Sequence, residues 1–84
     1  MSKKMQIAKF TAIFDPAEEG GYTVTVPSLP GCITEGDTFE EAVEMAEEAI
    51  LGYLESLKKN NEPIPEEKRS SLISVINVPV PITH

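Results

Sequence analysis

The chain has 84 residues and a formal net charge of −7, because 14 Asp and Glu residues outnumber 7 Lys and Arg residues. This length corresponds to one domain, residues 1–84, and the negative charge repels phosphate backbones, which argues against direct DNA or RNA binding. A single cysteine excludes an internal disulfide, and no stretch approaches the roughly 18 apolar residues of a membrane span, so we expect a cytoplasmic protein without membrane contact.

The first predicted elements are two antiparallel strands joined by a hairpin loop. Met5 to Phe14 predicts a strand, because every second residue from Ala8 onward is apolar. Residues 15–21, DPAEEGG, have the Pro and Gly content of a loop. Their carboxylates (Asp15, Glu18, Glu19) could bind a metal, but a solvated loop is the ordinary explanation. Tyr22 to Val26 alternates apolar residues with threonine and predicts the second strand.

A proline-rich connection and a third short strand follow. The two prolines of residues 27–31, PSLPG, cannot both occupy a central strand, so the chain is expected to turn at a sheet edge. Cys32 to Glu35 predicts a short strand. Gly36 and Asp37 then form the bend into a helix.

The strongest local pattern is a helix from Thr38 to Lys59. Thr38 is a favourable N-cap, and Glu41 three positions later completes a capping box. Apolar residues recur at steps of three and four, which predicts one face against a sheet. Asn60 or Asn61 is expected to end the helix in a left-handed conformation. The apolar stripe is Phe39, Ala42, Val43, Ala46, Ala49, Ile50, Tyr53, Leu54 and Leu57.

Leu72 to Val78 predicts a fourth strand after a polar connection of about a dozen residues. Both of its faces are largely apolar. One helix cannot cover both of them, so part of this surface is expected to meet a second chain. The predicted fold is therefore α+β, in the order β-β-β-α-β, with a four-stranded sheet under one long helix.

Groups that carry out catalysis are scarce in this chain. The only histidine is the last residue, His84, and no zinc, phosphate-loop or Ser/His/Asp pattern is present. Cys32 could be a reactive thiol, but no basic residue flanks it, and a semi-buried structural role is the simpler explanation. The helix glutamates could bind a metal for nuclease chemistry. However, side chains on the solvent face of a helix point away from one another and do not converge on an ion. We therefore expect no enzyme, no cofactor and no metal.

Residues 10–57 resemble the HicB-type antitoxins of bacterial and archaeal toxin–antitoxin pairs and their solitary relatives. The matching run begins with a strand and the pattern D-P-x-E-x-G-G-Y, continues through V-P-x-L-P-G-C-x-T-x-G-D-T-x-E-E-A, and ends in an Ala- and Glu-rich helix. The resemblance implies a partial ribonuclease H fold that is catalytically inactive. It implies a homodimer or higher oligomer. It also implies binding to HicA, a small basic toxin that cleaves mRNA and whose active site the antitoxin covers.

The short chain departs from many family members, which carry a C-terminal DNA-binding domain. Autorepression by direct DNA binding is therefore not expected, and a solitary homo-oligomeric structural or regulatory module without a toxin is the alternative function. We expect partner binding at the loop of residues 15–21, at the proline-rich connection, and at the third strand with the bend that follows it. The structural alternative is that the glycines only serve special backbone angles. The predicted binding residues are Glu18, Glu19, Pro27, Leu29, Pro30, Gly31, Cys32, Thr34, Gly36 and Asp37.

Overall fold

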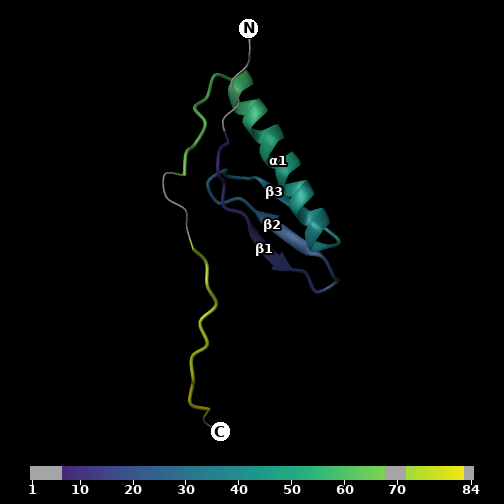
Figure 1. Ribbon diagram of the computed structural model, residues 1–84, viewed down its shortest axis with the longest axis vertical. Helices are drawn as coiled ribbons and strands as arrows, with labels where there is room; N and C mark the ends of the chain where they lie inside the picture. Colours follow the sequence, from purple (N-terminus) through teal and green to yellow (C-terminus); the bar gives the residue numbers. More distant parts are fainter. Residues whose placement is uncertain (1–6, 68–71, 83–84) are drawn as a thin grey trace.

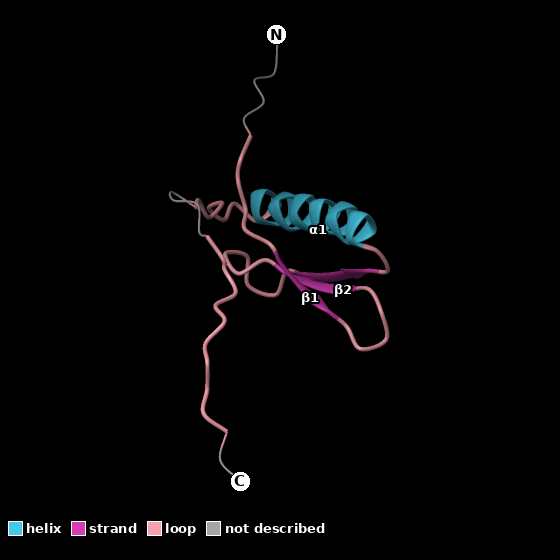
Figure 2. Ribbon diagram, turned by 60° about the horizontal axis from the view of Figure 1, so that its bottom comes forward, coloured by secondary structure: helices cyan, strands magenta, loops and turns pink. Residues whose placement is uncertain are grey.

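In the computed structural model, which describes residues 7–67 and 72–82, three antiparallel strands pack under one helix (Figure 1). The strands are β1 (Ile13–Pro16), β2 (Tyr22–Thr25) and β3 (Ile33–Gly36), in the spatial order β1-β2-β3. The helix α1 (Phe39–Lys59) lies across one face of this sheet, and no described segment covers the other face (Figure 2). The α+β class and the order β-β-β-α agree with the sequence prediction.

The register of the sheet divides its residues between a helix-covered and a helix-free face. Val24 of β2 lies opposite Phe14 of β1 and Thr34 of β3, while Thr25 lies opposite Ile13 and Ile33. Val24 is fully buried against Ala42 and Ala46 of α1, so the Val24 row faces the helix. Because side chains alternate along a strand, the Thr25 row and the neighbouring Thr23 row form the helix-free face.

The core consists of two adjoining apolar clusters. Beneath the first half of α1, Val24 packs with Ala42 and Ala46, and Phe14 and Tyr22 flank them. Beneath the second half, the buried residues Val26, Leu29 and Cys32 come from the chain around the β2–β3 loop. Small residues at 42 and 46 let the helix backbone approach the sheet closely. The second cluster supports the part of α1 that extends beyond the four-residue strands.

Local capping begins and ends α1 close to the predicted positions. The Thr38 hydroxyl accepts a hydrogen bond from the Glu41 N–H at 3.0 Å, and Glu41 Oε1 accepts one from the Asp37 N–H at 3.2 Å. The capping box is thus present, with its return bond one residue earlier than in the standard motif. At the other end Asn61 has φ 56°, the left-handed conformation expected at Asn60 or Asn61.

Two strand predictions require correction. The first strand begins at Ile13 rather than near Met5; residues 7–12 form no described strand, and Met5 and Gln6 lie outside the described residues. The reason is that β2 ends at Thr25, opposite Ile13, and the chain then turns into the Pro27 loop, so the residues before Ile13 have no partner there.

The second correction concerns Leu72 to Val78, where no strand is formed. Residues 72–82 run away from the domain as an exposed extended segment (Figure 1), so the described sheet has three strands and not four. Apolar alternation identified a segment suited to pairing. Pairing itself needs a neighbouring strand edge, which this segment does not contact within the described part of the chain.

Candidate functional site

One end of the molecule gathers the β1–β2 loop and the start of α1. The loop is closed by hydrogen bonds from the Ala17 N–H to the Gly21 carbonyl and from the Gly20 N–H to the Ala17 carbonyl, both 3.0 Å. Gly21 lies so close to the Gly36 carbonyl and the Asp37 Cα that no side chain fits between them. These contacts bring two loops that are distant in sequence to one end of the domain (Figure 1).

This end is strongly acidic, and we call it the acidic end. Its carboxylates are all exposed, and they come from β1, the β1–β2 loop, the β3–α1 turn and the first turn of α1. The lysines of the described ranges lie far from it, at Lys9 and at Lys58 and Lys59 at the end of α1. The charge is therefore polarised along the domain. The acidic end comprises Asp15, Glu18, Glu19, Asp37, Glu40 and Glu41.

The Pro27–Cys32 connection is a rigid loop at the other end of the short strands. Its backbone bonds run from the Leu29 N–H to the Val26 carbonyl at 3.0 Å and from the Cys32 N–H to the Leu29 carbonyl at 2.9 Å. The Tyr53 hydroxyl of α1 donates to the Pro30 carbonyl at 2.9 Å and ties the loop to the helix. Gly31 has φ 82°, a conformation that glycine adopts without strain.

The structure therefore separates the predicted binding residues into two groups and assigns some of them to the core. Leu29 and Cys32 are 0% and 5% exposed, and Gly36 is buried against α1, so these three support the loops from inside. Burial raises the pKa of the Cys32 thiol, which favours its unreactive protonated form. The members that remain exposed are Glu18, Glu19 and Asp37 at the acidic end and Pro27, Pro30 and Gly31 on the loop; Thr34 is half-buried on the helix-covered face.

Glu67 is a residue that sequence reasoning missed. Its carboxylate accepts hydrogen bonds from the Thr11 hydroxyl at 2.7 Å, the Thr11 N–H at 2.8 Å and the Ser28 hydroxyl at 2.8 Å. The Glu67 carboxylate thus connects the residues before β1 to those after β2, where the two segments no longer pair as strands. These hydrogen bonds hold the pKa of Glu67 below its ordinary range, the Thr11 hydroxyl contributing most. No local pattern signals a contact between residues 56 positions apart.

Replacing Glu67 with Gln is expected to lower stability near neutral pH and to have little effect in acid. The folded-state pKa lies below the unfolded one, so the carboxylate stabilises the fold above its unfolded pKa and loses this as pH falls through the folded pKa. The urea midpoints of the two proteins, measured at about pH 7 and about pH 3, should therefore differ at the higher pH and converge at the lower. A difference that is independent of pH would contradict an ionised acceptor.

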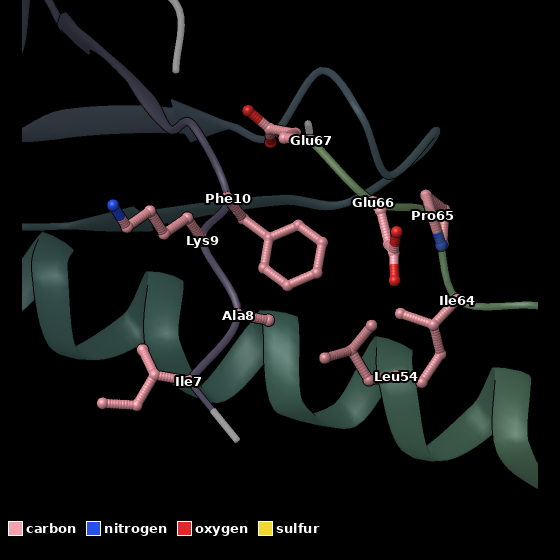
Figure 3. Close-up of a pocket in the computed structure, with 9 residues that line it drawn as sticks. All are labelled: Ile7, Ala8, Lys9, Phe10, Leu54, Ile64, Pro65, Glu66 and Glu67. Atoms are coloured by element: carbon pink, nitrogen blue, oxygen red, sulfur yellow. The ribbon is translucent and has the colours of Figure 1, made fainter. Parts of the chain in front are cut away.

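Two adjoining hollows lie between the chain leading into β1 and α1. The first, of about 580 Å³, is lined by Phe10, Leu54, Ile64 and residues 65–67; the Phe10 ring projects between the segments (Figure 3). The second, of about 480 Å³, continues along the helix toward Phe14 and Val43. Both are open; the first includes the charged residues Lys9, Glu66 and Glu67 in its lining, whereas Glu47 is the one charged residue that lines the second.

The described residues offer neither a metal-binding cluster nor a membrane-spanning helix. Among residues 7–67 and 72–82, no three His, Cys, Asp or Glu side chains are grouped so as to hold a metal ion. No helix in the described part of the chain is both long and apolar enough to cross a membrane.

Comparison with known proteins gives a consistent result. The family model for the HicB-like antitoxin of bacterial toxin-antitoxin systems matches residues 10–79. The UPF0150 protein Ta0767 of Thermoplasma acidophilum is 48% identical over 64 residues, which are 76% of this chain and 93% of that protein. Antitoxin HicB 1 of Photorhabdus laumondii is 44% identical and antitoxin HicB of Escherichia coli K12 is 37% identical, each over 57 residues and 68% of this chain. Those 57 residues are 37% and 41% of the two antitoxins, so the chain matches about two fifths of their length.

Proposed function

Because the chain belongs to the HicB-like antitoxin family of bacterial toxin–antitoxin systems, we propose that it binds a HicA-type mRNA-cleaving toxin and masks its active site. The role is non-enzymatic: the chain acts by occupying a surface of another protein. Membership of the family is the observation that carries this proposal. The acidic end supports it by offering a surface of the right charge.

The toxin class is basic, since it must bind RNA, and the acidic end is complementary to such a partner. Exposed carboxylates concentrated at one end raise the local attraction for a cationic surface and speed association. The same carboxylates repel RNA. An antitoxin bound through them occupies the toxin's cationic surface and therefore competes directly with the RNA substrate. Glu18, Glu19 and Asp37 are the exposed predicted residues that this surface brings together.

The helix-free face extends the acidic end across the sheet. Asp15, Thr23 and Glu35 lie side by side on β1, β2 and β3 in the register of the two ladders. Adjacent strands are about 4.8 Å apart, so the two carboxylates flank Thr23 with roughly 10 Å between their backbones. A toxin that contacts the acidic end, which includes Asp15, therefore meets one further carboxylate, Glu35, on this open face.

The proposal predicts that a small basic toxin is encoded beside this gene, and the direct test is co-expression of the two proteins. The two proteins should co-purify as a stable complex, and added antitoxin should stop mRNA cleavage by the isolated toxin in proportion to the complex formed. Cleavage that continues at saturating antitoxin, together with failure to co-purify, would contradict the proposal. A homo-oligomer that forms equally with or without the toxin would then favour the solitary module.

A further inference from the structure

The helix-free face of the sheet lies open, because α1 covers the opposite face and no other described segment covers this one (Figure 2). The two ladders arrange its side chains in two rows. Each row places a threonine of β2 between two side chains of the same kind, which are carboxylates in one row and isoleucines in the other. The rows are Asp15–Thr23–Glu35 and Ile13–Thr25–Ile33.

The isoleucine row gives this face an apolar contact for another protein. Ile33 is 63% exposed on β3, and Ile13 is half-buried on β1. An exposed aliphatic side chain beside charged groups is the composition of an interface core with its polar rim. The isoleucines and threonines of both rows are β-branched, so their χ1 angles are restricted before any partner binds. A partner that docks here therefore orders few side chains, which lowers the entropic cost of binding.

The charge of the helix-free face has one sign. Asp15 and Glu35 are both exposed, and the strands of the sheet contain no lysine or arginine. Lys58 and Lys59 end α1, which lies on the other side of the sheet. Lys9 precedes Asp15 by up to about 20 Å of extended chain. The two carboxylates are therefore available to cations of another molecule.

The charge of this face selects its occupant. Two copies of this chain docked face to face would bring four carboxylates into one contact, with no cation from any strand of the sheet. Like charges placed opposite one another in an interface disfavour association. RNA is disfavoured by the same carboxylates, because its phosphates are also negative. The occupant that fits is a protein surface that combines cationic side chains with an apolar contact.

We propose that the helix-free face is the surface that holds the toxin, and that an arginine or lysine of the toxin lies over Thr23 between Asp15 and Glu35. This inference rests on the proposed antitoxin function and names the contact through which it acts. The backbones of β1 and β3 each lie about 4.8 Å from β2, so one cation above Thr23 can donate hydrogen bonds to both carboxylates. A cation held there is withdrawn from the phosphates of the RNA substrate.

The acidic end and the helix-free face then have different kinetic roles. Charges at the rim of an interface change mainly the association rate and its dependence on salt. Side chains that the partner covers change mainly the dissociation rate. Glu18 and Glu19 of the exposed β1–β2 loop therefore steer the toxin toward the sheet, whereas Glu35 and Ile33 determine how long the toxin stays bound.

The dissociation rate of the complex with an inactive toxin variant tests the proposal in full-length chains. D15N/E35Q should raise this rate about 30-fold and I33A at least about 10-fold, while the association rates fall less than about threefold. The matched control E48Q/E55Q removes the same number of charges from α1 and should leave the rate unchanged. All five positions are exposed, so circular dichroism should show unchanged helix content. Equal dissociation rates of D15N/E35Q and the control, in complexes that still inhibit the toxin, would overturn this contact and leave the antitoxin function intact.

Cross-saturation NMR locates the contact directly. Saturation of the unlabelled inactive toxin should pass to the methyl groups of Ile13 and Ile33 in the deuterated, methyl-labelled chain, and much less to those of Leu51. Leu51 is the matched control, because it is 54% exposed, comparable to Ile33 at 63%, but lies on α1. Transfer to Leu51 in place of Ile33, or equal transfer to Ile33 from an unlabelled second copy without toxin, would overturn the proposal. A wild-type chain that binds no toxin would contradict the antitoxin function and this contact together.

Discussion

Replacing Gly36 with alanine is expected to lower the free energy of unfolding by about 3 kcal/mol, at the upper end of overpacking substitutions. An added Cβ would lie 2.6 Å from the Ala42 Cα and 2.9 Å from the Glu41 carbonyl carbon, and closer still to the Ala42 nitrogen. All three are backbone atoms of α1, which cannot rotate away as a side chain does. The helix would have to lift from β3, exposing the cluster around Val24.

The matched control for this substitution is Gly52→Ala. Gly52 lies within α1 and an added Cβ meets nothing within 4 Å. This change should raise stability by about 0.5–1 kcal/mol, because alanine loses less backbone entropy in a helix. Urea unfolding followed by circular dichroism, at one protein concentration for all variants, measures both. Equal stability of G36A and the wild-type chain would show that the helix does not rest on β3 as described.

Reversing charge at the acidic end is expected to slow association with the basic toxin by about 100-fold at low ionic strength. The variant E18K/E19K/D37K converts exposed carboxylates of the β1–β2 loop and the β3–α1 turn into cations. The difference from the wild-type rate should shrink in about 0.5 M salt, where screening lengths fall to a few ångströms. Stopped-flow mixing with an inactive toxin variant measures the rate.

A second triple reversal separates local from global charge. E48K/E55K/E62K changes the net charge by the same amount, but its exposed residues lie along the second half of α1 and just beyond its end. It should slow association much less than the acidic-end variant. Equal effects of the two variants would mean that the net charge steers the toxin, and the acidic end would lose its assignment as the contact surface.

Much of the fold and part of the site could be predicted because they depend on neighbours in sequence. Thr38 and Glu41 cap the helix three residues apart, and Asn61 ends it through its own backbone angle. The β1–β2 hairpin follows from alternation on either side of a Gly-rich loop. The solvated loop predicted for Asp15, Glu18 and Glu19 agrees with their exposure, although sequence did not show that Asp37 joins Glu18 and Glu19.

Sequence by itself determined the composition of this protein's elements: one long amphipathic helix, a hairpin, a proline-bounded loop and an apolar last segment, each encoded by residues a few positions apart. Only the tertiary structure decided that Leu29 and Cys32 are core residues and that Glu67 reaches Thr11 and Ser28. It also placed residues 72–82 outside the three-stranded sheet. The physical reason is that periodicity states which residues avoid water, whereas their burial partner depends on where distant segments of chain meet.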